Sequence, residues 1–341
     1  MAIPEPKIPF IDNPSEYASP SLDRFIDDDR AWTLNTIDPN NMIVRLNDDQ
    51  QAELKEIAKD LTDNPFPELM RNPDHINAPE LSVAMKKITS LLDSPGFGVI
   101  DRLALDDMDL DTAKSIYWIL GQMVSRPVAQ KWDGTMLYDV LDIGKKGEAK
   151  GYGLRGSLTN AELFFHTDNG FNVNLPDAVS LLCVNQAKEG GVNRFASVYS
   201  LHNRLLERCP EHLKRLYQPV LFNRNMEHAE GEPTILRTSI FSWDGERLIA
   251  RPNPFYVYQA YEMAGIEMET ELTDAIDALR EVAKDTDLWV EMRMERGQMQ
   301  FLNNRQVLHY RSSYVDYDEP ERQRHAIRMW YRKSGRQMYN G

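Results

Sequence analysis

The sequence has little cysteine, no cationic block and no long apolar run, and each shortage excludes a class of protein. Two cysteines, Cys183 and Cys209, in 341 residues cannot form a disulfide framework. Cys183 stands in an apolar run and is expected to be a small buried side chain. The sequence has 39 basic and 53 acidic residues, and its net charge of −14 argues against binding to a nucleic-acid backbone.

The apolar segments are also short. None approaches the length that crosses a bilayer. Residues 1–12 lack the basic stretch and apolar stretch that together make a secretory signal. We therefore expect a cytoplasmic protein with a small-molecule substrate and with neither a membrane nor a nucleic acid as a partner.

The hydrophobic fraction of 42% is enough for a sizeable core, and its periodicity predicts the elements of that core. Helices are expected over residues 48–61, 79–92, 110–124, 199–208 and 272–283. Strands are expected over 97–100, 178–184, 194–198, 235–241, 247–251, 288–294, 299–303 and 325–332. Residues 295–298 are predicted to form a hairpin turn between two of these strands. Many strands with helices near the start and in insertions favour an α+β chain with a closed or sandwiched β core.

We expect one domain over residues 1–341. Residues 1–95 would form an N-terminal extension with helices packed on the core, 96–332 the core, and 333–341 a short tail. Five glycines within residues 144–156 predict either a plain connector or a lid over a site. Residues 151–156 also read G-x-G-x-x-G, but a dinucleotide site needs a strand before that motif and a helix after it, and neither is expected here.

One short motif carries metal-binding side chains. His166 and Asp168 are two residues apart, and in an extended chain both side chains lie on one face while Thr167 points away. The apolar run Leu163–Phe165 precedes them, as expected for a strand that leads into a cavity. His309 ends another short β-like run. Two histidines and one carboxylate leave half of an octahedral metal open, which suits Fe(II) and oxygen chemistry.

Among the remaining histidines, His228 is the one rival ligand, although its polar sequence is also typical of a loop. His202 and His212 fall in helical stretches near charged residues and are expected to face solvent. His75 falls in a turn.

Two late arginines strengthen the metal interpretation. In a strand, Arg324, Ala326, Arg328 and Trp330 share one face. At about 3.3 Å per residue, the backbone anchors of the two arginines lie roughly 13 Å apart. This distance is too long for both to hold one small carboxylate, so we expect two anions at different depths of one cavity. The alternative is a pair of ordinary ion-paired arginines on an edge strand.

Taken together, these residues resemble the TauD/TfdA-like (clavaminate-synthase-like) Fe(II)- and 2-oxoglutarate-dependent dioxygenases. The matching residues are His166-x-Asp168, Gly190-Gly191, Asn303-Asn304-Arg305-x-x-Leu308-His309-x-Arg311 and Arg324-x-x-x-Arg328-x-Trp330. The resemblance covers about residues 97–332. It implies a double-stranded β-helix (jelly-roll) core with flanking helices, and it is compatible with a homo-oligomer.

Carried over by position, the resemblance implies that the His-x-Asp pair and His309 hold the iron. It implies that Arg324 pairs with the distal carboxylate of 2-oxoglutarate. Arg328 matches the position that grips the anionic group of the substrate in sulfonate-using members. Asn193 stands where members usually have Thr or Ser, and its amide can donate the same hydrogen bond to 2-oxoglutarate. The implied reaction oxidises a small, anionic or amino-acid-like substrate with O2 and releases succinate and CO2.

Hydroxylation is the outcome we expect, because Asp168 is present whereas related halogenases lack the carboxylate. Desaturation, ring closure and bond cleavage stay open as alternatives. A second class of enzyme is a metal-dependent hydrolase that uses the same three side chains with zinc and an activated water, but it gives Arg324 no task. A third is a non-catalytic jelly-roll binding protein, although a dead site has no physical reason to keep all four side chains.

Overall fold

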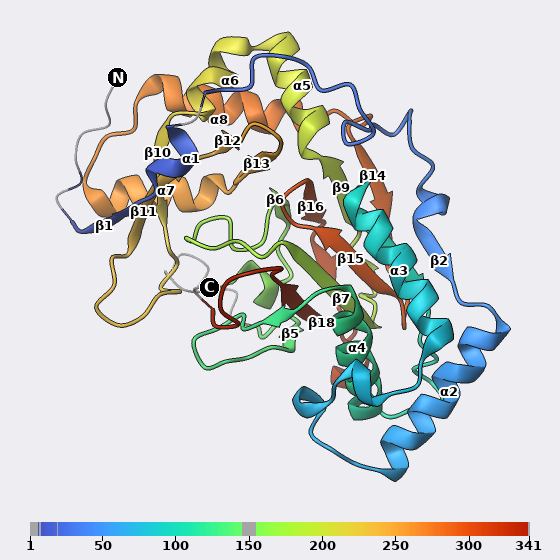
Figure 1. Ribbon diagram of the computed structural model, residues 1–341. Helices are drawn as coiled ribbons and strands as arrows, with labels where there is room; N and C mark the ends of the chain where they lie inside the picture. The colour runs from blue at the N-terminus through green and yellow to red at the C-terminus, as the bar shows by residue number, and fades with distance from the viewer. Residues whose placement is uncertain (1–5, 7, 19, 145–154, 340–341) are drawn as a thin grey trace.

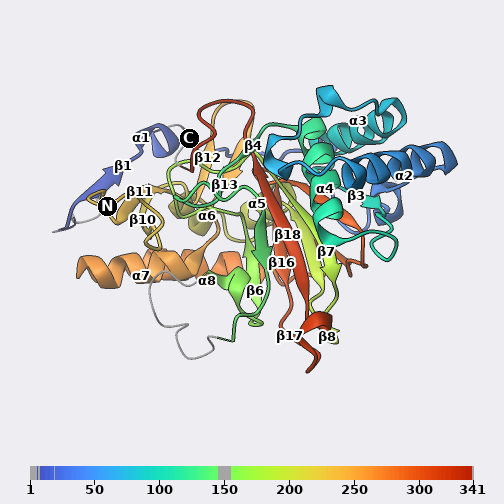
Figure 2. The ribbon, with the colours of Figure 1, turned by 90° about the horizontal axis from the view of Figure 1, so that it is seen from below.

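Two β-sheets lie face to face at the centre of the computed structural model, which describes residues 6, 8–18, 20–144 and 155–339 (Figures 1 and 2). One sheet contains β2 (Ile43–Arg45), β3 (Phe97–Asp101), β15 (Met299–Asn303), β7 (Ala178–Asn185), β18 (His325–Tyr331) and β4 (Pro127–Val128), and β5 (Tyr138–Val140) also pairs with β18. The other contains β14 (Trp289–Met292), β9 (Asn193–Ser197), β16 (Val307–Arg311) and β6 (Leu163–His166). Phe97 and Leu302 of the first sheet pack against Phe195 and Val307 of the second.

Three helices cover the outer face of the larger sheet: α2 (Asp48–Asp63), α3 (Pro79–Asp93) and α4 (Leu110–Val124) (Figure 1). The side chain of Asp109 caps α4 by accepting a hydrogen bond from the Thr112 amide. Buried residues of these helices pack against Ile327 and Met329 of β18. Because side chains alternate along a strand, the intervening Arg328 turns to the opposite face, between the sheets.

The other side of the molecule is built from the insertion that follows β9. Its elements are α5 (Val198–Arg208), α6 (Pro210–Leu216), β10 (Pro219–Asn223), β11 (Ile235–Ser239), β12 (Phe241–Trp243), β13 (Leu248–Ala250), α7 (Pro254–Ala264) and α8 (Thr270–Val282). The N-terminal β1 (Phe10–Asp12) pairs in parallel with β11, and α1 (Pro14–Tyr17) follows it. Elements far apart in sequence therefore share one apolar cluster on this side.

Short elements complete the chain. The two-stranded pair β8 (Glu189–Gly190) and β17 (Tyr314–Val315) joins two loops at one end of the sheets. Short 3-10 helices lie at Pro39–Met42, Glu68–Met70, Pro73–His75, Gly156–Leu158 and Pro320–Arg322. No helix among the described residues is long and apolar enough to cross a membrane.

The mixed helix and sheet content agrees with the sequence analysis, and α4 and β15 have the predicted bounds. The hairpin predicted at residues 295–298 is wrong. The chain does turn there, with the Gln298 amide donating to the Glu295 carbonyl. However, β14 before the turn pairs with β9, whereas β15 after it pairs with β3 and β7. The turn thus carries the chain from one sheet to the other.

The predicted exposure of His202 is also wrong. Its side chain is buried, it makes a 2.9 Å hydrogen bond with the Tyr217 hydroxyl, and burial lowers the pKa of its imidazole to about 4. His202 lies on the face of α5 that packs on the core, so the charged residues beside it in sequence lie on the other faces of the helix.

Candidate metal centre and its cavities

Two strands of the smaller sheet bring the candidate ligands together. β6 and β16 are antiparallel neighbours with His166 directly opposite His309, and the two imidazole centroids are 4.2 Å apart. Asp168 Oδ1 lies 3.5 Å from His309 Nε2 and 3.8 Å from His166 Nε2. One candidate ligand atom from each of the three side chains lies within 4.8 Å of the others. His228, the rival in the sequence, does not belong to this group.

His166 presents the ring nitrogen that a metal requires. The Nδ1 of His166 is 2.7 Å from the Phe164 carbonyl oxygen. A carbonyl can only accept, so Nδ1 carries the proton and Nε2 has a free lone pair toward Asp168. Burial, with His309 adding to it, lowers the pKa of His166 to about 3. The imidazole is therefore neutral, which is the form that binds metal.

Asp168 lies just beyond β6, which ends at His166, so the backbone around it has to be held by other means. The Asn304 side chain does this: its Oδ1 accepts from the Asp168 amide at 2.8 Å and its Nδ2 donates to the Asp168 carbonyl at 3.0 Å. The buried hydroxyl of Thr167 donates to the Ala250 carbonyl at 3.2 Å and turns that side chain away from the site.

The carboxylate of Asp168 is oriented through one of its oxygens. Trp330 Nε1 donates to Oδ2 at 2.7 Å, and Arg328 Nη1 lies 3.0 Å from the same atom. Oδ1 is left facing the two histidines. Burial alone would raise the pKa of Asp168, but Arg328 and His309 hold it well below its usual range. Two imidazoles and one carboxylate oxygen at these separations fit a divalent metal with open coordination positions.

A cavity of about 500 Å³ adjoins these ligands. Its walls carry aromatic rings together with charged side chains of both signs. The lining residues include Arg155, Glu227, Arg328 and Trp330. Arg328 therefore faces both this cavity and the carboxylate of Asp168.

Arg324 lies in a second, much smaller cavity, together with Gly190, Gly191 and Asn193. Gly191 has φ +65°, a conformation that favours glycine. A Cβ on Gly190 would lie 2.2 Å from the Ser313 carbonyl oxygen, so this residue has no room for a side chain. Arg324 Nη1 is buried and has no acceptor among the residues described. Arg328 and Arg324 therefore line two separate cavities, whereas the sequence analysis expected both to line a single one.

The sequence matches the model of the TauD, or taurine catabolism dioxygenase TauD/TfdA, family over residues 62–330. The chain belongs to this family. It is 30% identical over 251 residues to FR-33289 synthase of Streptomyces rubellomurinus, covering 71% of each chain. It is 26% identical over 204 residues to the taurine hydroxylase-like protein SAT17 of Stachybotrys chartarum, covering 58% of this chain and 50% of that protein.

Solved structures share the fold. Asparagine oxygenase in complex with Fe(II), 2S,3S-3-hydroxyasparagine and succinate aligns with a TM-score of 0.63 at 18% identity, covering 86% of this chain and 94% of that one. The non-heme iron oxygenase OrfP with Fe and alpha-ketoglutaric acid aligns with a TM-score of 0.57 at 14% identity and the same coverage. As a TauD-family member with a His-Asp-His site, the protein is an oxidoreductase that uses Fe(II), 2-oxoglutarate and O2. This family assignment favours the oxygenase over the hydrolase and the binding protein.

Sequence reasoning missed several residues around the site. Asn304 was quoted only as part of a motif, and Gln130 carried no signal at all. Glu227 stands beside His228 in a stretch interpreted as a polar loop. Tyr339 belongs to the predicted short tail, yet its side chain is buried. The predicted connector or lid at residues 144–156, with its G-x-G-x-x-G motif, lies mostly outside the described residues.

Proposed function

We propose that this oxygenase hydroxylates a small substrate that carries an oxyanion, such as the carboxylate of an amino acid, with release of succinate and CO2. The observation that carries the proposal is the position of Arg328, which lines the larger cavity and lies 3.0 Å from the metal-binding carboxylate. A substrate anion held there would place its neighbouring carbons beside the metal. The solved structures that contain hydroxylated asparagine and arginine support an amino-acid-like substrate.

The positions of the two cavities indicate which side chains would bind the metal and which would bind 2-oxoglutarate. His166, Asp168 and His309 would hold Fe(II), which with 2-oxoglutarate supplies the oxidising chemistry when bound. Arg324 would take the distal carboxylate of 2-oxoglutarate, because its buried Nη1 has no acceptor in the described part of the chain. Asn193 lines the same cavity and would donate an amide hydrogen bond to that carboxylate.

We also infer that the two facing sheets form the double-stranded β-helix (jelly-roll) core of a single domain over residues 1–341. In support, β1 and α1 from the N-terminus pack on the central insertion. A cytoplasmic location remains part of the proposal, supported by the two unpaired cysteines.

A substrate screen with purified protein, Fe(II) and 2-oxoglutarate tests the function, with O2 uptake and succinate release as readouts. We expect turnover with anionic amino acids or similar small acids, and loss of that preference in Arg328→Ala. Anaerobic titration with Fe(II) and 2-oxoglutarate should give a weak visible charge-transfer band. Absence of the band from the wild type, or activity that needs neither O2 nor keto-acid, would instead support the hydrolase.

A further inference from the structure

Two arginines meet in the wall of the larger cavity, and only one of them was singled out in the sequence. Arg155 Nη2 donates to the Gln130 carbonyl at 2.6 Å, and Arg328 Nε donates to the Gln130 side-chain oxygen at 2.8 Å. Both guanidinium groups also lie against the same two rings. The Cζ of Arg155 is 5.1 Å from the centroid of the Tyr138 ring and 5.7 Å from that of the Trp330 ring. The Cζ of Arg328 is 5.0 Å from the Tyr138 centroid and 4.8 Å from the Trp330 centroid. Gln130 and the two rings therefore hold the arginines as a pair.

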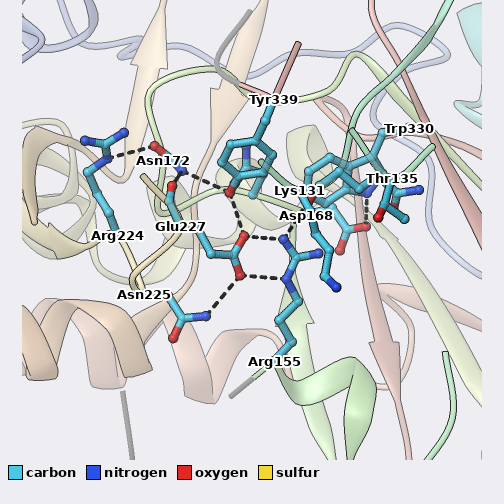
Figure 3. A network of polar contacts seen from close by, with 12 residues as sticks. Lys131, Thr135, Arg155, Asp168, Asn172, Arg224, Asn225, Glu227, Trp330 and Tyr339 are labelled. Carbon is cyan, nitrogen blue, oxygen red and sulfur yellow. Dashed lines mark hydrogen bonds and ion pairs between the residues drawn. The ribbon is translucent and has the colours of Figure 1, made fainter. Parts of the chain in front are cut away.

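The partly buried carboxylate of Glu227 fixes Arg155 in this position (Figure 3). Glu227 Oε1 accepts from Arg155 Nε at 2.7 Å and from Asn225 Nδ2 at 3.1 Å, and Oε2 accepts from Arg155 Nη2 and from the Tyr339 hydroxyl at 2.6 Å. Tyr339 also accepts a hydrogen bond from Asn172 at 3.0 Å. Such a bidentate pair aligns the guanidinium plane as well as neutralising charge. Arg155 is thereby held as a rigid donor.

The backbone that delivers Glu227 is strained. Asn225 and Met226 have φ values of +52° and +56°, in the left-handed region. Asparagine tolerates that region, but a methionine adopts it only at an energetic cost. Strain of this kind gathers at functional sites, and here it lies in the loop that positions Glu227.

One nitrogen of Arg155 has no task within the described structure. Its Nη1 is buried, and no acceptor for it lies in residues 8–18, 20–144 or 155–339 that the structure describes. An unpaired buried donor is unfavourable, because it has given up its hydrogen bonds to water without replacing them. Arg155 lines the same cavity as Arg328 and the metal ligands, so a ligand in that cavity can satisfy Nη1.

We propose that Arg155 is a second anion-binding residue of the substrate cavity, which together with Arg328 receives an oxyanion of the substrate. Glu227 and Tyr339 are positioning residues for Arg155. This inference rests on the proposed function and narrows the substrate to one whose anionic group offers at least two oxygens, one for each arginine. A carboxylate and a tetrahedral oxyanion share that chemistry.

The test is an anaerobic titration of enzyme loaded with Fe(II) and 2-oxoglutarate, using sodium acetate and sodium sulfate as probes at constant ionic strength. Tryptophan fluorescence reports binding, because Trp330 lies against both arginines. We expect Arg155→Gln to weaken binding of the preferred anion 10- to 100-fold, since a hydrogen bond to a charged group is worth about 1.5–3 kcal/mol. Stronger binding of acetate would identify a carboxylate as the anionic group, and stronger binding of sulfate a tetrahedral one.

Three further variants separate a specific contact from charge or folding. Arg155→Lys keeps the charge and loses the planar fork, so it should still weaken binding at least 5-fold. Glu227→Gln should weaken binding by a smaller factor than Arg155→Gln, because Arg155 is present but no longer held by a carboxylate. Arg237→Gln removes a matched bidentate arginine, which pairs with Asp12 on β1 at 2.6 and 2.9 Å. It should leave the anion affinity within 2-fold of wild type.

The proposal is overturned if Arg155→Gln, or Arg155→Lys with an intact charge-transfer band, binds both anions within 2-fold of wild type. An effect of Arg237→Gln equal to that of Arg155→Gln also overturns it, because the loss would then reflect net charge. The same titration is run without Fe(II) and 2-oxoglutarate. If the wild type gives no charge-transfer band, the proposed function fails, while these metal-free titrations still decide whether Arg155 binds an anion.

Discussion

Replacing Trp330 by phenylalanine should weaken iron binding without emptying the cavity wall. The indole Nε1 donates to Asp168 Oδ2 at 2.7 Å, and both residues are buried. Phenylalanine retains an aromatic ring against Arg328 but has no donor. The carboxylate then keeps only Arg328 Nη1, at 3.0 Å, as a direct side-chain partner on that oxygen. Its Oδ1 is therefore free to rotate away from the two histidines.

The expected change in the Fe(II) Kd follows from the strength of the lost hydrogen bond. A hydrogen bond to a charged group contributes about 1.5–3 kcal/mol, and loss of an outer-shell partner typically lowers metal affinity about 10- to 100-fold. Since Arg328 still holds Oδ2, we expect the lower part of that range, a rise of about 10- to 30-fold in the Fe(II) Kd. The measurement is an anaerobic Fe(II) titration at saturating 2-oxoglutarate, followed by the charge-transfer band.

Trp32→Phe is the matched control. Trp32 is also buried, and its Nε1 donates at 2.7 Å to the Pro95 carbonyl, in a cluster between the sheets. This variant should lower the free energy of unfolding by about 1 kcal/mol and leave the Fe(II) Kd within 2-fold of wild type. An unchanged Kd in Trp330→Phe, or an equal rise in both variants, would refute the argument that Trp330 orients the ligand.

Substitutions at three other residues have definite expected outcomes. Asp168→Ala should abolish Fe(II) binding in equilibrium dialysis, because the one anionic ligand of the site is lost. Arg324→Gln should raise the Kd of 2-oxoglutarate about 10- to 100-fold while metal binding in its absence stays unchanged, and Arg324→Lys should recover only part of that loss. His202→Gln should remove a pH dependence of the free energy of unfolding. The pKa of His202 in the folded protein is about 4, so its contribution to stability is complete above about pH 6.5. That contribution falls by about 3 kcal/mol as the pH drops to about 4, because the unfolded chain takes up the proton first. Urea denaturation of wild type and His202→Gln at pH 7 and pH 5 measures the difference.

The sequence predicted those parts of the structure that depend on local pattern. The spacing of apolar residues sets a helix such as α4 and a strand such as β15, and both have the predicted bounds. The sequence also indicated the candidate metal ligands, because metal binding needs particular residue types at the ends of strands and few histidines satisfy that requirement. The facing of Arg328 into the core followed from strand alternation in the same way.

What could not be predicted depends on contacts between distant segments. A turn at residues 295–298 shows that the chain reverses, but the pairing of β14 with β9 is decided by packing far along the sequence. His202 is buried because α5 covers the core, and charged neighbours in sequence do not reveal that. Tyr339 reaches Glu227 from 112 residues away, and no periodicity or motif marks such a contact.

The shared use of Asp168 Oδ2 by two donors is another feature that the sequence did not predict, and it bears on the proposed function. Trp330 and Arg328 both bind this oxygen, and Arg328 also lines the substrate cavity. Under the proposed function, a substrate anion that binds Arg328 would weaken the hold of Arg328 on Asp168, so cavity occupancy and the orientation of this candidate metal ligand would be linked. In that case the Trp330 hydrogen bond, at 2.7 Å, would still hold the carboxylate in place. A loss of activity in Arg328→Ala therefore reports on substrate binding only if the Fe(II) Kd of the same variant is measured beside it.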